Sequence, residues 1–292
     1  MVTVRAPATS ANLGSGFDVF GVALSRPADV LRVERAERTT IEVTGVGSEY
    51  IPEDPGKNTV GAVAEALDAP AHIRIEKGVR PSSGLGSSAA SAAGAALALA
   101  RLYDRNRTRR DLIPVAAEGE AVVSGEPHAD NVTPALLGGF TVASDRVTDV
   151  GATVPLVVCL PEIAVSTRDA RRVVPESTSM DDLVHTVGRA ATLAVGMCRS
   201  DPALVGAGME ERVVTPRRAR LITGYDGVRE AALGAGATGV TVSGAGPAVL
   251  AACPDPCRRD VAGAMVDAFA DAGVEARAYQ TRIGRGATVY GD

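Results

Sequence analysis

The chain has 292 residues, of which 46% are hydrophobic and 22% are charged, and its formal net charge at pH 7 is −5. This length suits one large domain or two of ordinary size, and the hydrophobic share excludes general disorder. The acidic balance argues against a nucleic-acid binder, which needs a basic surface to engage phosphates. The longest apolar stretch, Ala89 to Ala100, is far shorter than the roughly 20 residues of a membrane span. We therefore expect a soluble, cytosolic protein with neither a nucleic-acid nor a membrane partner.

The cysteines and histidines do not predict a metal site. Cys253 and Cys257 form a C-x3-C pair without a second pair, and the three histidines are scattered along the chain. A structural zinc site needs four such ligands, so none is expected. Cys159 lies in an apolar Val-Val-Cys-Leu run and is predicted to be a buried thiol in a strand.

The hydrophobic pattern predicts both strands and helices in the first half of the chain. Strands are predicted over Val2–Ala6, Val30–Val33, Thr40–Val43, Ala71–Ile75 and Phe140–Ala143. Helices are predicted over Thr59–Leu67, Ala89–Leu102 and Asp111–Val123, the last with Asp111 as its N-cap. The segment from Ser124 to Gly139 is rich in Gly, Pro, His and Asp, and no element is predicted there.

A polar, turn-rich segment over Asp145–Thr153 predicts a domain boundary near residue 150. Beyond it, strands are predicted over Val154–Leu160, Gly239–Ser243, Ala248–Cys253 and Ala276–Gln280. Helices are predicted over Met180–Arg199, Val228–Leu233 and Arg258–Ala272. Because strands and helices do not alternate in a regular βαβ rhythm, the pattern favours an α+β fold in two domains.

A glycine- and serine-rich turn, PSSGLGSSAA, runs from Pro81 to Ala90 at the start of a predicted helix. Gly84 and Gly86 permit backbone conformations closed to other residues and a close approach to a ligand. The unpaired N–H groups at the helix start would make an anion site, and the alternative is an ordinary serine-capped helix. No lysine follows the glycines, so the run is not a Walker P-loop. The acidic residue that a dinucleotide-binding turn requires is also missing.

Two further clusters place polar groups or glycines next to predicted strands. The run from Ala6 to Asp18 reads APATSANLGSGFD. Its Asn12 and Asp18 flank a glycine loop, where they could hold a small substrate or form a plain Asx turn. The run from Val242 to Pro247 reads VSGAGP and is either a tight hairpin or a second anion contact.

In their order and spacing the three clusters resemble the motifs of the GHMP kinase superfamily. That superfamily includes galactokinase, homoserine kinase, mevalonate kinase and phosphomevalonate kinase. The matching segments are Pro7–Asp18, Pro81–Ala90 and Ser243–Pro247. The resemblance implies an ATP-binding N-terminal domain over residues 1–150, related to ribosomal protein S5 domain 2. It also implies a ferredoxin-like C-terminal domain over residues 151–292, with ATP between the two domains.

Within the superfamily, the chain is most similar to the homoserine kinases. The segment Glu126–Gly139, EPHADNVTPALLGG, resembles their H-x-D-N-V-x-P-A-x-x-G-G signature. Ser166–Pro175 resembles their S-T-x-x-A-R-x-x-L-P stretch, with Val174 for Leu, and Pro216–Ile222 resembles a later arginine segment. The resemblance implies a homodimeric enzyme that transfers the γ-phosphate of ATP to the hydroxyl of L-homoserine. The product would be O-phospho-L-homoserine, in threonine biosynthesis.

The resemblance also implies residue roles, position by position. The ATP phosphates would lie on Pro81, Ser82, Ser83, Gly84, Leu85, Gly86, Ser87, Ser88 and Ala89, with Asn58 on the adenine side. Mg²⁺ would be held by Ser88 and Glu120. The substrate would contact Asn12, Asp18, His128, Arg171, Arg218, Gly244 and Gly246. In that set the two arginines would clamp the carboxylate, Asn12 and Asp18 would hold the amino end, and loop packing is the alternative for His128.

Asp130 and Asn131 are the candidates for the catalytic position beside the substrate hydroxyl. In mevalonate-type members an Asp there is the candidate base, whereas homoserine kinases are thought to place Asn there and to rely on positioning. Phosphoryl transfer has a loose transition state that needs little proton removal beforehand. We predict that Asn131 faces the hydroxyl and that Asp130 is a structural or substrate contact.

Two other functions stay open at the level of sequence. An archaeal shikimate kinase or a mevalonate-pathway kinase would keep the same ATP site, although the paired arginines and Glu126–Gly139 disfavour isoprenoid substrates. A non-catalytic ligand sensor of the same fold would be expected to lose the metal ligands, whereas Ser87, Ser88 and Glu120 are all present.

Overall fold

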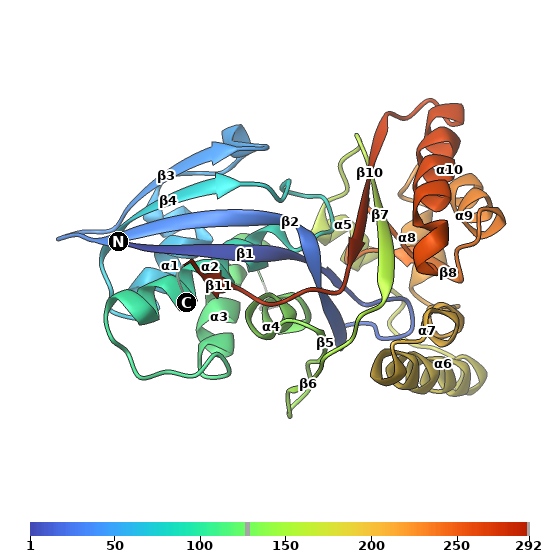
Figure 1. Cartoon of the computed structure of the whole chain (residues 1–292), viewed down its shortest axis with the longest axis horizontal. Coiled ribbons are helices and arrows are strands. Elements are labelled where there is room, and N and C mark those ends of the chain that lie inside the picture. Colours follow the sequence, from blue (N-terminus) through green and yellow to red (C-terminus); the bar gives the residue numbers. More distant parts are fainter. Residues whose placement is uncertain (126–128, 291–292) are drawn as a thin grey trace.

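The structure is a computed structural model that describes residues 1–125 and 129–290. It holds two β-sheets, which lie side by side along the long axis of the molecule, each with its own helices (Figure 1). The strands of the first sheet come mainly from the first half of the chain, and those of the second sheet come from the second half. This arrangement confirms the predicted α+β fold.

The first sheet has the strand order β11-β1-β2-β4-β3, and β5 extends it beside β2, with β6 beside β5. Its strands are β1 (Val2–Ala11), β2 (Phe20–Arg35), β3 (Thr40–Gly45), β4 (Ala71–Lys77), β5 (Phe140–Val142), β6 (Thr148–Val150) and β11 (Thr288–Val289). Strand β3 runs parallel to β4, whereas the other pairs are antiparallel. Strands β1 and β2 pair along most of their length, with an irregularity between Pro7 and Thr9.

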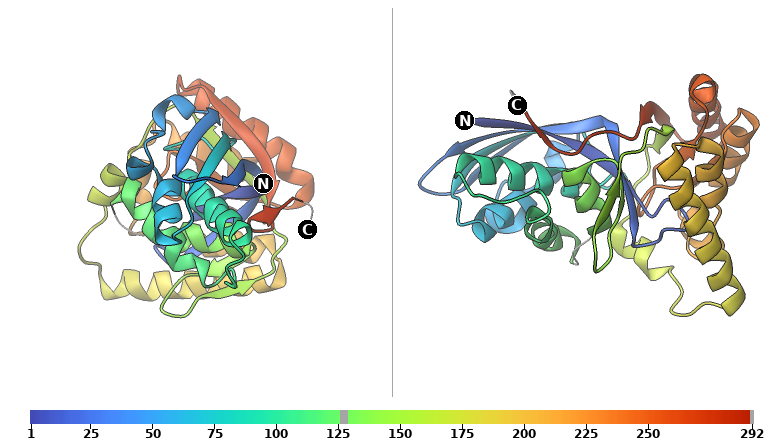
Figure 2. Two further views of the ribbon diagram at one scale, coloured as in Figure 1. Left: turned by 90° about the vertical axis from the view of Figure 1, so that its left-hand side faces the viewer. Right: turned by 60° about the horizontal axis from the view of Figure 1, so that its bottom comes forward.

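Four helices cover one face of the first sheet (Figures 1 and 2). They are α1 (Thr59–Ala66), α2 (Ser87–Leu102), α3 (Leu112–Ser124) and α4 (Ala129–Leu137). Helix α2 contacts β1, β2 and all three of the other helices. Half of its residues are alanines, all of them buried, and small residues allow such close packing on every side. The N-terminus of α2 is therefore fixed firmly in space.

The second sheet has the order β10-β7-β9-β8 and is antiparallel throughout. Its strands are β7 (Pro155–Pro161), β8 (Gly239–Val242), β9 (Val249–Ala252) and β10 (Ala276–Arg282). The helices of this half are α5 (Thr167–Arg172), α6 (Met180–Arg199), α7 (Pro202–Gly208), α8 (Thr215–Ala219), α9 (Tyr225–Gly234) and α10 (Arg258–Asp271). Short 3-10 turns occur at η1 (Ser48–Tyr50), η2 (Pro55–Lys57) and η3 (Asp255–Cys257).

The chain passes from one sheet to the other between β6 and β7, at residues 151–154. Strand β11, near the end of the chain, then returns to pair with β1 of the first sheet. The larger hydrophobic core also extends from the first sheet onto the inner side of β7 and the C-terminal half of α6. The division into residues 1–150 and 151–292 therefore stays a prediction, and the last segment packs on the first sheet.

The predicted elements all occur, with ends shifted by a few residues except in β2, which begins well before Val30. One segment without a predicted element, Ser124–Gly139, contains helix α4. A proline inside a helix is destabilising. The burial of Val132, Ala135 and Leu136, in a helix that packs against β1 and β2, offsets the cost of Pro134. Asp111 stands at the N-cap of α3 as predicted, but its carboxylate accepts from the N–H and hydroxyl of Thr108 instead of capping the helix.

The structure also describes the surroundings of Cys159 and the lengths of the helices. Cys159 is fully buried in β7, and burial raises the pKa of its thiol to about 12. Among residues 1–125 and 129–290, no helix combines the length and the apolarity that crossing a membrane requires.

Candidate active site

A cavity of about 540 Å³ lies where the helices of the first sheet meet α5, α8 and the β8–β9 turn of the second half. Most of the residues singled out from sequence line it: Asn12, Asp18, Asn58, Pro81, Ser82, Ser83, Gly84, Gly86, Ser87, Ser88, Glu120, Asp130, Asn131, Arg171, Arg218, Gly244 and Gly246. Leu85 and Ala89 are buried side chains that do not line it. His128 lies outside the described residues.

The floor of the cavity is the N-terminus of α2. Gly86 is its N-cap residue in a left-handed conformation, with φ 61°, and no side chain caps the helix. A Cβ atom on Gly86 would lie 1.9 Å from Thr9 Oγ1, and one on Gly84 would lie 2.5 Å from the carbonyl oxygen of Ser243. Only glycine fits either position. The first N–H groups of α2 therefore stay open toward the cavity, as in an anion-binding helix end.

Hydrogen bonds join the three glycine-containing motifs into one unit. The backbone N–H of Thr9 donates to the carbonyl oxygen of Leu85 at 3.0 Å. The Ser243 hydroxyl lies 2.8 Å from both Ser10 Oγ and the carbonyl oxygen of Gly84. The N–H of Gly244 donates to the carbonyl oxygen of Ala11 at 3.1 Å. Segments more than 200 residues apart in sequence thus meet around the start of α2.

Asn12 holds the loop between β1 and β2 in place. Its Nδ2 donates to the carbonyl oxygen of Gly244 at 3.0 Å, and its Oδ1 accepts from the N–H of Asp18 at 2.9 Å. Both residues have positive φ angles, 71° and 56°. The amide of Asn12 therefore fixes the backbone of Asp18, whose carboxylate lines the cavity and forms an ion pair with Arg171.

Two guanidinium groups lie over the ring of Phe17. The Arg171 group is 5.5 Å from the ring centroid and the Arg218 group is 5.0 Å from it. Arg218 is buried and donates to the carbonyl oxygens of Gly244 at 2.8 Å and Ala170 at 3.3 Å. Burial lowers the pKa of the Arg218 guanidinium, and the nearby Asp18 carboxylate opposes that effect. This end of the cavity is suited to an anionic group that two arginines can reach.

Ser88 and Glu120 form a pair of oxygen donors beside the start of α2. The Ser88 hydroxyl donates to Glu120 Oε1 at 2.9 Å. Burial raises the pKa of the Glu120 carboxyl to about 8, while the Ser88 hydrogen bond opposes the rise and the charge of Asp130 adds to it. A buried carboxylate whose charge is costly in the free protein is well suited to face a cation.

Asp130 and Asn131 begin α4 and both face the cavity. Asn131 Oδ1 accepts from the Thr9 hydroxyl at 2.8 Å, and its Nδ2 lies 3.3 Å from Asp130 Oδ1. These contacts fix the orientation of the Asn131 amide, because its two ends have different partners.

Comparison with known proteins identifies the fold and its family. The family "GHMP kinases N terminal domain" matches residues 57–139, and "GHMP kinases C terminal" matches residues 193–272. A homoserine kinase of Halorubrum lacusprofundi is 76% identical over 290 residues, with 99% of each chain covered. The chain belongs to the homoserine kinases of the GHMP kinase family.

Two further relatives agree with this assignment. A homoserine kinase of Haloquadratum walsbyi is 75% identical over 291 residues, which cover 99% of this chain and all of that one. A crystal structure of homoserine kinase from Cytophaga hutchinsonii superposes with a TM-score of 0.89 at 34% identity, covering 99% of this chain and 96% of that one. The predicted two-part kinase fold is thereby confirmed.

Asn58 has a structural position, as Asn12 does. Its Oδ1 caps α1 by accepting from the N–H of Val60 at 3.0 Å, and its Nδ2 donates to the carbonyl oxygen of Pro52 at 2.6 Å. Both ends of the amide are thus used within the protein. Next to it the cavity wall is formed by Tyr50, Ile51 and Pro52, which present flat or apolar surfaces suited to a base.

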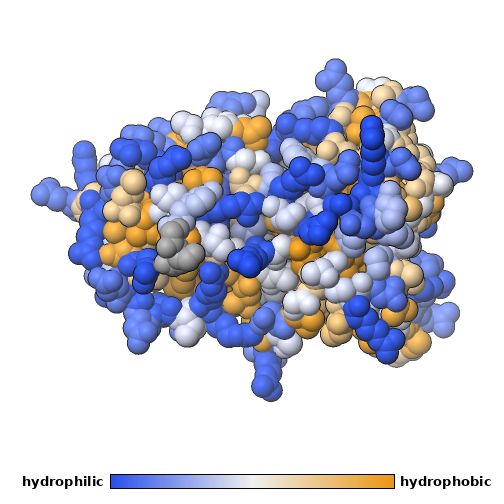
Figure 3. All heavy atoms as spheres, in the orientation of Figure 1, coloured by the Kyte–Doolittle hydropathy of each residue, from blue (hydrophilic) through white to orange (hydrophobic). Residues whose placement is uncertain are grey.

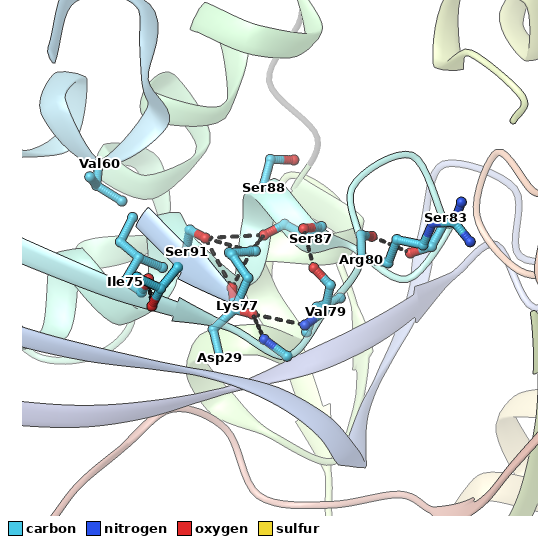
Figure 4. Close-up of polar contacts among 12 residues, drawn as sticks. Asp29, Val60, Ile75, Lys77, Val79, Arg80, Ser83, Ser87, Ser88 and Ser91 are labelled. Carbon is cyan, nitrogen blue, oxygen red and sulfur yellow. Dashed lines mark hydrogen bonds and ion pairs between the residues drawn. The ribbon is translucent and has the colours of Figure 1, made fainter. Parts of the chain in front are cut away.

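The sequence analysis missed a buried ion pair beside the first turn of α2. Lys77 of β4 pairs with Asp29 of β2, and both side chains are almost completely buried. Figure 4 shows Lys77 between Asp29 and the first turn of α2, where its Nζ donates to the Ser91 hydroxyl at 2.9 Å and to the Ser87 carbonyl oxygen at 3.1 Å. The other oxygen of Asp29 accepts from the N–H groups of Gly78 and Val79, each at 3.0 Å.

This cluster connects β2 and β4 to the first turn of α2 and to the residues that follow β4. The signal in the sequence was weak: Lys77 is one of only two lysines in the chain, and it occupies a position in β4 that alternation assigns to the buried face. Its partner lies 48 residues earlier in a strand that the local pattern predicts only in part.

Proposed function

We propose that the chain transfers the γ-phosphate of ATP to the hydroxyl of L-homoserine and so forms O-phospho-L-homoserine, a step of threonine biosynthesis. The observation that carries the proposal is the convergence of an open helix N-terminus, a carboxylate and two arginines in one cavity. The high identity to proteins named homoserine kinase, over the whole chain, supports this choice of substrate.

ATP would place its phosphates at the start of α2. The N–H groups of the first turn and the hydroxyl of Ser88 lie at the cavity, whereas the hydroxyl of Ser87 donates to the carbonyl oxygen of Val79 at 2.8 Å. The dipole of a long buried helix favours negative charge at this end. The adenine of ATP would lie beside Tyr50 and Pro52, next to Asn58.

Ser88 and Glu120 fit the role of Mg²⁺ ligands. Mg²⁺ prefers oxygen donors and commonly binds through one or two protein ligands plus phosphate oxygens. The two side chains already lie within hydrogen-bond distance at the cavity wall. When bound, Mg²⁺ would neutralise charge that develops on the phosphates. The carboxyl of Glu120 has to lose its proton to serve this role, because its pKa is raised to about 8.

The substrate end is suited to an amino acid as a zwitterion. Asp18 and Arg171 form an ion pair at the cavity wall, and Arg218 lies near both of them. An ammonium group can take the place of the arginine beside Asp18, and a carboxylate can take the place of the aspartate beside Arg171. Homoserine would thus exchange one ion pair for two, which offsets the cost of desolvating its charged ends.

Asn131 would orient the homoserine hydroxyl toward the γ-phosphate. Its amide is held by Thr9 and Asp130, so it can position the hydroxyl with little loss of freedom. Because the transition state of phosphoryl transfer is loose, this positioning accounts for the reaction without a strong base. Asp130 would keep the role of a structural contact, and the chain is proposed to act as a homodimer.

A coupled assay of ADP release tests this function. The purified protein with ATP and Mg²⁺ is compared on L-homoserine, shikimate and mevalonate at equal concentration. We expect turnover with homoserine only, and the product to have the mass of phosphohomoserine. Turnover with shikimate or mevalonate, and none with homoserine, would overturn the roles assigned to Asp18, Arg171 and Arg218 while leaving the ATP site intact.

A further inference from the structure

Two charged residues of the second half of the chain are buried. Hydrophilic residues cover much of the surface that Figure 3 shows, where water solvates their charges. Among the described residues after Gly151, Glu211 and Arg218 are the charged residues that lie inside the protein. A buried charge is costly unless the protein supplies hydrogen bonds or an opposite charge. Arg218 lines the active-site cavity, whereas the function proposed above gives Glu211 no role.

Glu211 lies in the linker between α7 and α8, and its carboxylate accepts hydrogen bonds from three consecutive backbone N–H groups. Its Oε1 accepts from the N–H groups of Val213 and Val214, the latter at 3.0 Å. Its Oε2 accepts from the N–H groups of Val214 and Thr215, at 2.8 Å and 2.5 Å. Backbone N–H groups thereby replace water around both carboxylate oxygens.

These hydrogen bonds complete the N-terminus of α8. The first N–H groups of a helix have no partner within the helix, and the side chain of the N-cap residue, Val214, does not supply one. Pro216 has no N–H. The N–H groups of Arg217 and Arg218 donate to the carbonyl oxygen of Val214 at 3.1 Å and 3.0 Å. With the bonds to Glu211, every N–H group of this turn has a partner.

Helix α8 carries Arg218 in its last turn. The guanidinium donates to the carbonyl oxygens of Ala170 and Gly244, and it lies 5.0 Å from the centroid of the Phe17 ring. These contacts orient the guanidinium, while the backbone of α8 sets how far it reaches into the cavity. A helix of five residues is too short to be stable without contacts outside it. Burial lowers the pKa of Arg218, and Glu211 is one of the carboxylates that oppose this effect.

The segment that leads to Glu211 also contacts the loop between β1 and β2. The Ser15 hydroxyl donates to the carbonyl oxygen of Gly208 at 2.7 Å, and this contact is buried. A Cβ atom on Gly14 would lie 2.0 Å from the carbonyl oxygen of Met209, so the two backbones are in direct contact. The linker therefore joins the loop at one end to α8 at the other.

We propose that Glu211 is a positioning residue for the substrate: by holding the start of α8, it sets the place of Arg218 and so the fit of the homoserine carboxylate. This inference rests on the function proposed above and on the role of Arg218 in it. Glu211 does not line the active-site cavity but a separate cavity of about 620 Å³. It therefore acts on homoserine through Arg218 and not by direct contact.

Steady-state kinetics of Glu211→Gln test this role. The substitution replaces one acceptor oxygen by an NH₂ group, which cannot accept from the N–H groups at the start of α8. We expect KM for L-homoserine to rise roughly 5- to 30-fold, as for lost hydrogen bonds to a charged group, and KM for ATP to stay within about 2-fold. Glu210→Gln is the matched control and should have wild-type kinetics, because Glu210 is exposed and pairs with Arg189.

A double-mutant cycle shows whether Glu211 acts through Arg218. In an Arg218→Ala background, Glu211→Gln should change KM for homoserine by less than about 2-fold, because the group that Glu211 positions is already absent. In an Arg171→Ala background, Glu211→Gln should again raise KM several-fold, because Arg218 is present and displaced. Equal rises in the two backgrounds would overturn the proposal, since a general loss of structure affects both alike.

Glu211→Asp is the conservative variant and keeps two acceptor oxygens. It should raise KM for homoserine less than Glu211→Gln does, and it takes the place of Glu211→Gln in the cycle if that variant does not fold. The wild-type reaction distinguishes the two levels of the account. No turnover of homoserine by wild type would overturn the proposed function. Turnover by wild type with an unchanged KM in Glu211→Gln would overturn the role of Glu211 and leave the proposed function intact.

Discussion

The two ends of the active site of this kinase differ in how firmly they are held. The phosphate end is built on the N-terminus of α2, a helix with most of its side chains buried, and is held by hydrogen bonds between three motifs and by a buried ion pair. At the substrate end, Arg171 and Asp18 have side chains that are 44% and 39% exposed, and α5 is a helix of six residues. Under the proposed roles, ATP would therefore bind a site that is already formed. Homoserine would bind charged groups that have to exchange partners.

The metal-binding role proposed for Glu120, at the phosphate end, gives the largest expected effect. Glu120→Gln should lower kcat roughly 100-fold or more, since a neutral amide neutralises less charge at the transferring phosphate. Glu118→Gln, an exposed glutamate on the same helix, is the matched control and should have wild-type activity. Steady-state kinetics at saturating Mg²⁺ measure both. A Glu120→Gln enzyme with near-normal kcat would show that this end does not depend on the carboxylate.

The buried ion pair should decide how stable the phosphate end is. Lys77→Met leaves the carboxylate of Asp29 buried without its cation, and breaking such a pair costs about 3–5 kcal/mol. The exposed Lys57 is the other lysine of the chain, and Lys57→Met should change the free energy of unfolding by less than about 0.5 kcal/mol. Urea unfolding of the two variants at one pH makes the comparison. Equal losses would mean that the pair does not anchor the start of α2.

A substitution at the substrate end should change the KM for homoserine and leave the KM for ATP unchanged. Arg171→Ala removes one proposed partner of the substrate carboxylate and should raise KM for homoserine about 10- to 100-fold, with KM for ATP unchanged. Arg172→Ala is the control, since Arg172 is the next residue of α5 and pairs with Asp169. An equal rise of KM for both substrates in Arg171→Ala would erase the distinction between the two ends.

How much of this site the sequence predicts depends on whether the signal is local. Gly84, Gly86 and the serines after them mark an anion site because the glycines must adopt unusual backbone conformations next to a helix start. The amphipathic helix over Met180–Arg199 follows from local periodicity with its ends in the right place. Asp29 and Lys77, in contrast, acquire their role only when β2, β4 and α2 meet, and no local pattern records that contact.

Helix α4 shows a second limit of local reasoning. Its segment contains Pro134 and lies among glycines, so propensity argues against a helix. Tertiary packing overrides that propensity, because Val132 and Leu136 bury their side chains against the first sheet. The directions of the Asp130 and Asn131 side chains depend on this helix. The sequence therefore shows that the two residues are adjacent but does not show which of them faces the cavity.

The smallest expected effect concerns the pH dependence of stability. The pKa of Glu120 rises from 4.5 to about 8 on folding, so the folded protein holds this proton more tightly than the unfolded chain does. The contribution of Glu120 to stability therefore falls as pH rises from about 4.5 to 8 and is constant above that. Without Mg²⁺, Glu120→Gln should exceed wild type in Tm by more at pH 8 than at pH 5, because the amide does not lose this contribution as pH rises.

Thermal unfolding of both proteins between pH 5 and pH 9 measures this difference. The gap in Tm should widen up to about pH 8 and then stay level. A gap that is independent of pH would mean that the Glu120 carboxyl keeps an ordinary pKa in the folded protein.

The most direct test of the account is to locate the transferred phosphate on the product. If Arg171 and Arg218 hold the carboxylate while Asn131 presents the hydroxyl, turnover of L-homoserine yields one product with phosphorus bonded to the side-chain oxygen, visible by mass and by phosphorus–proton coupling in NMR. An acyl phosphate on the carboxylate, or no transfer to homoserine at all, would contradict it.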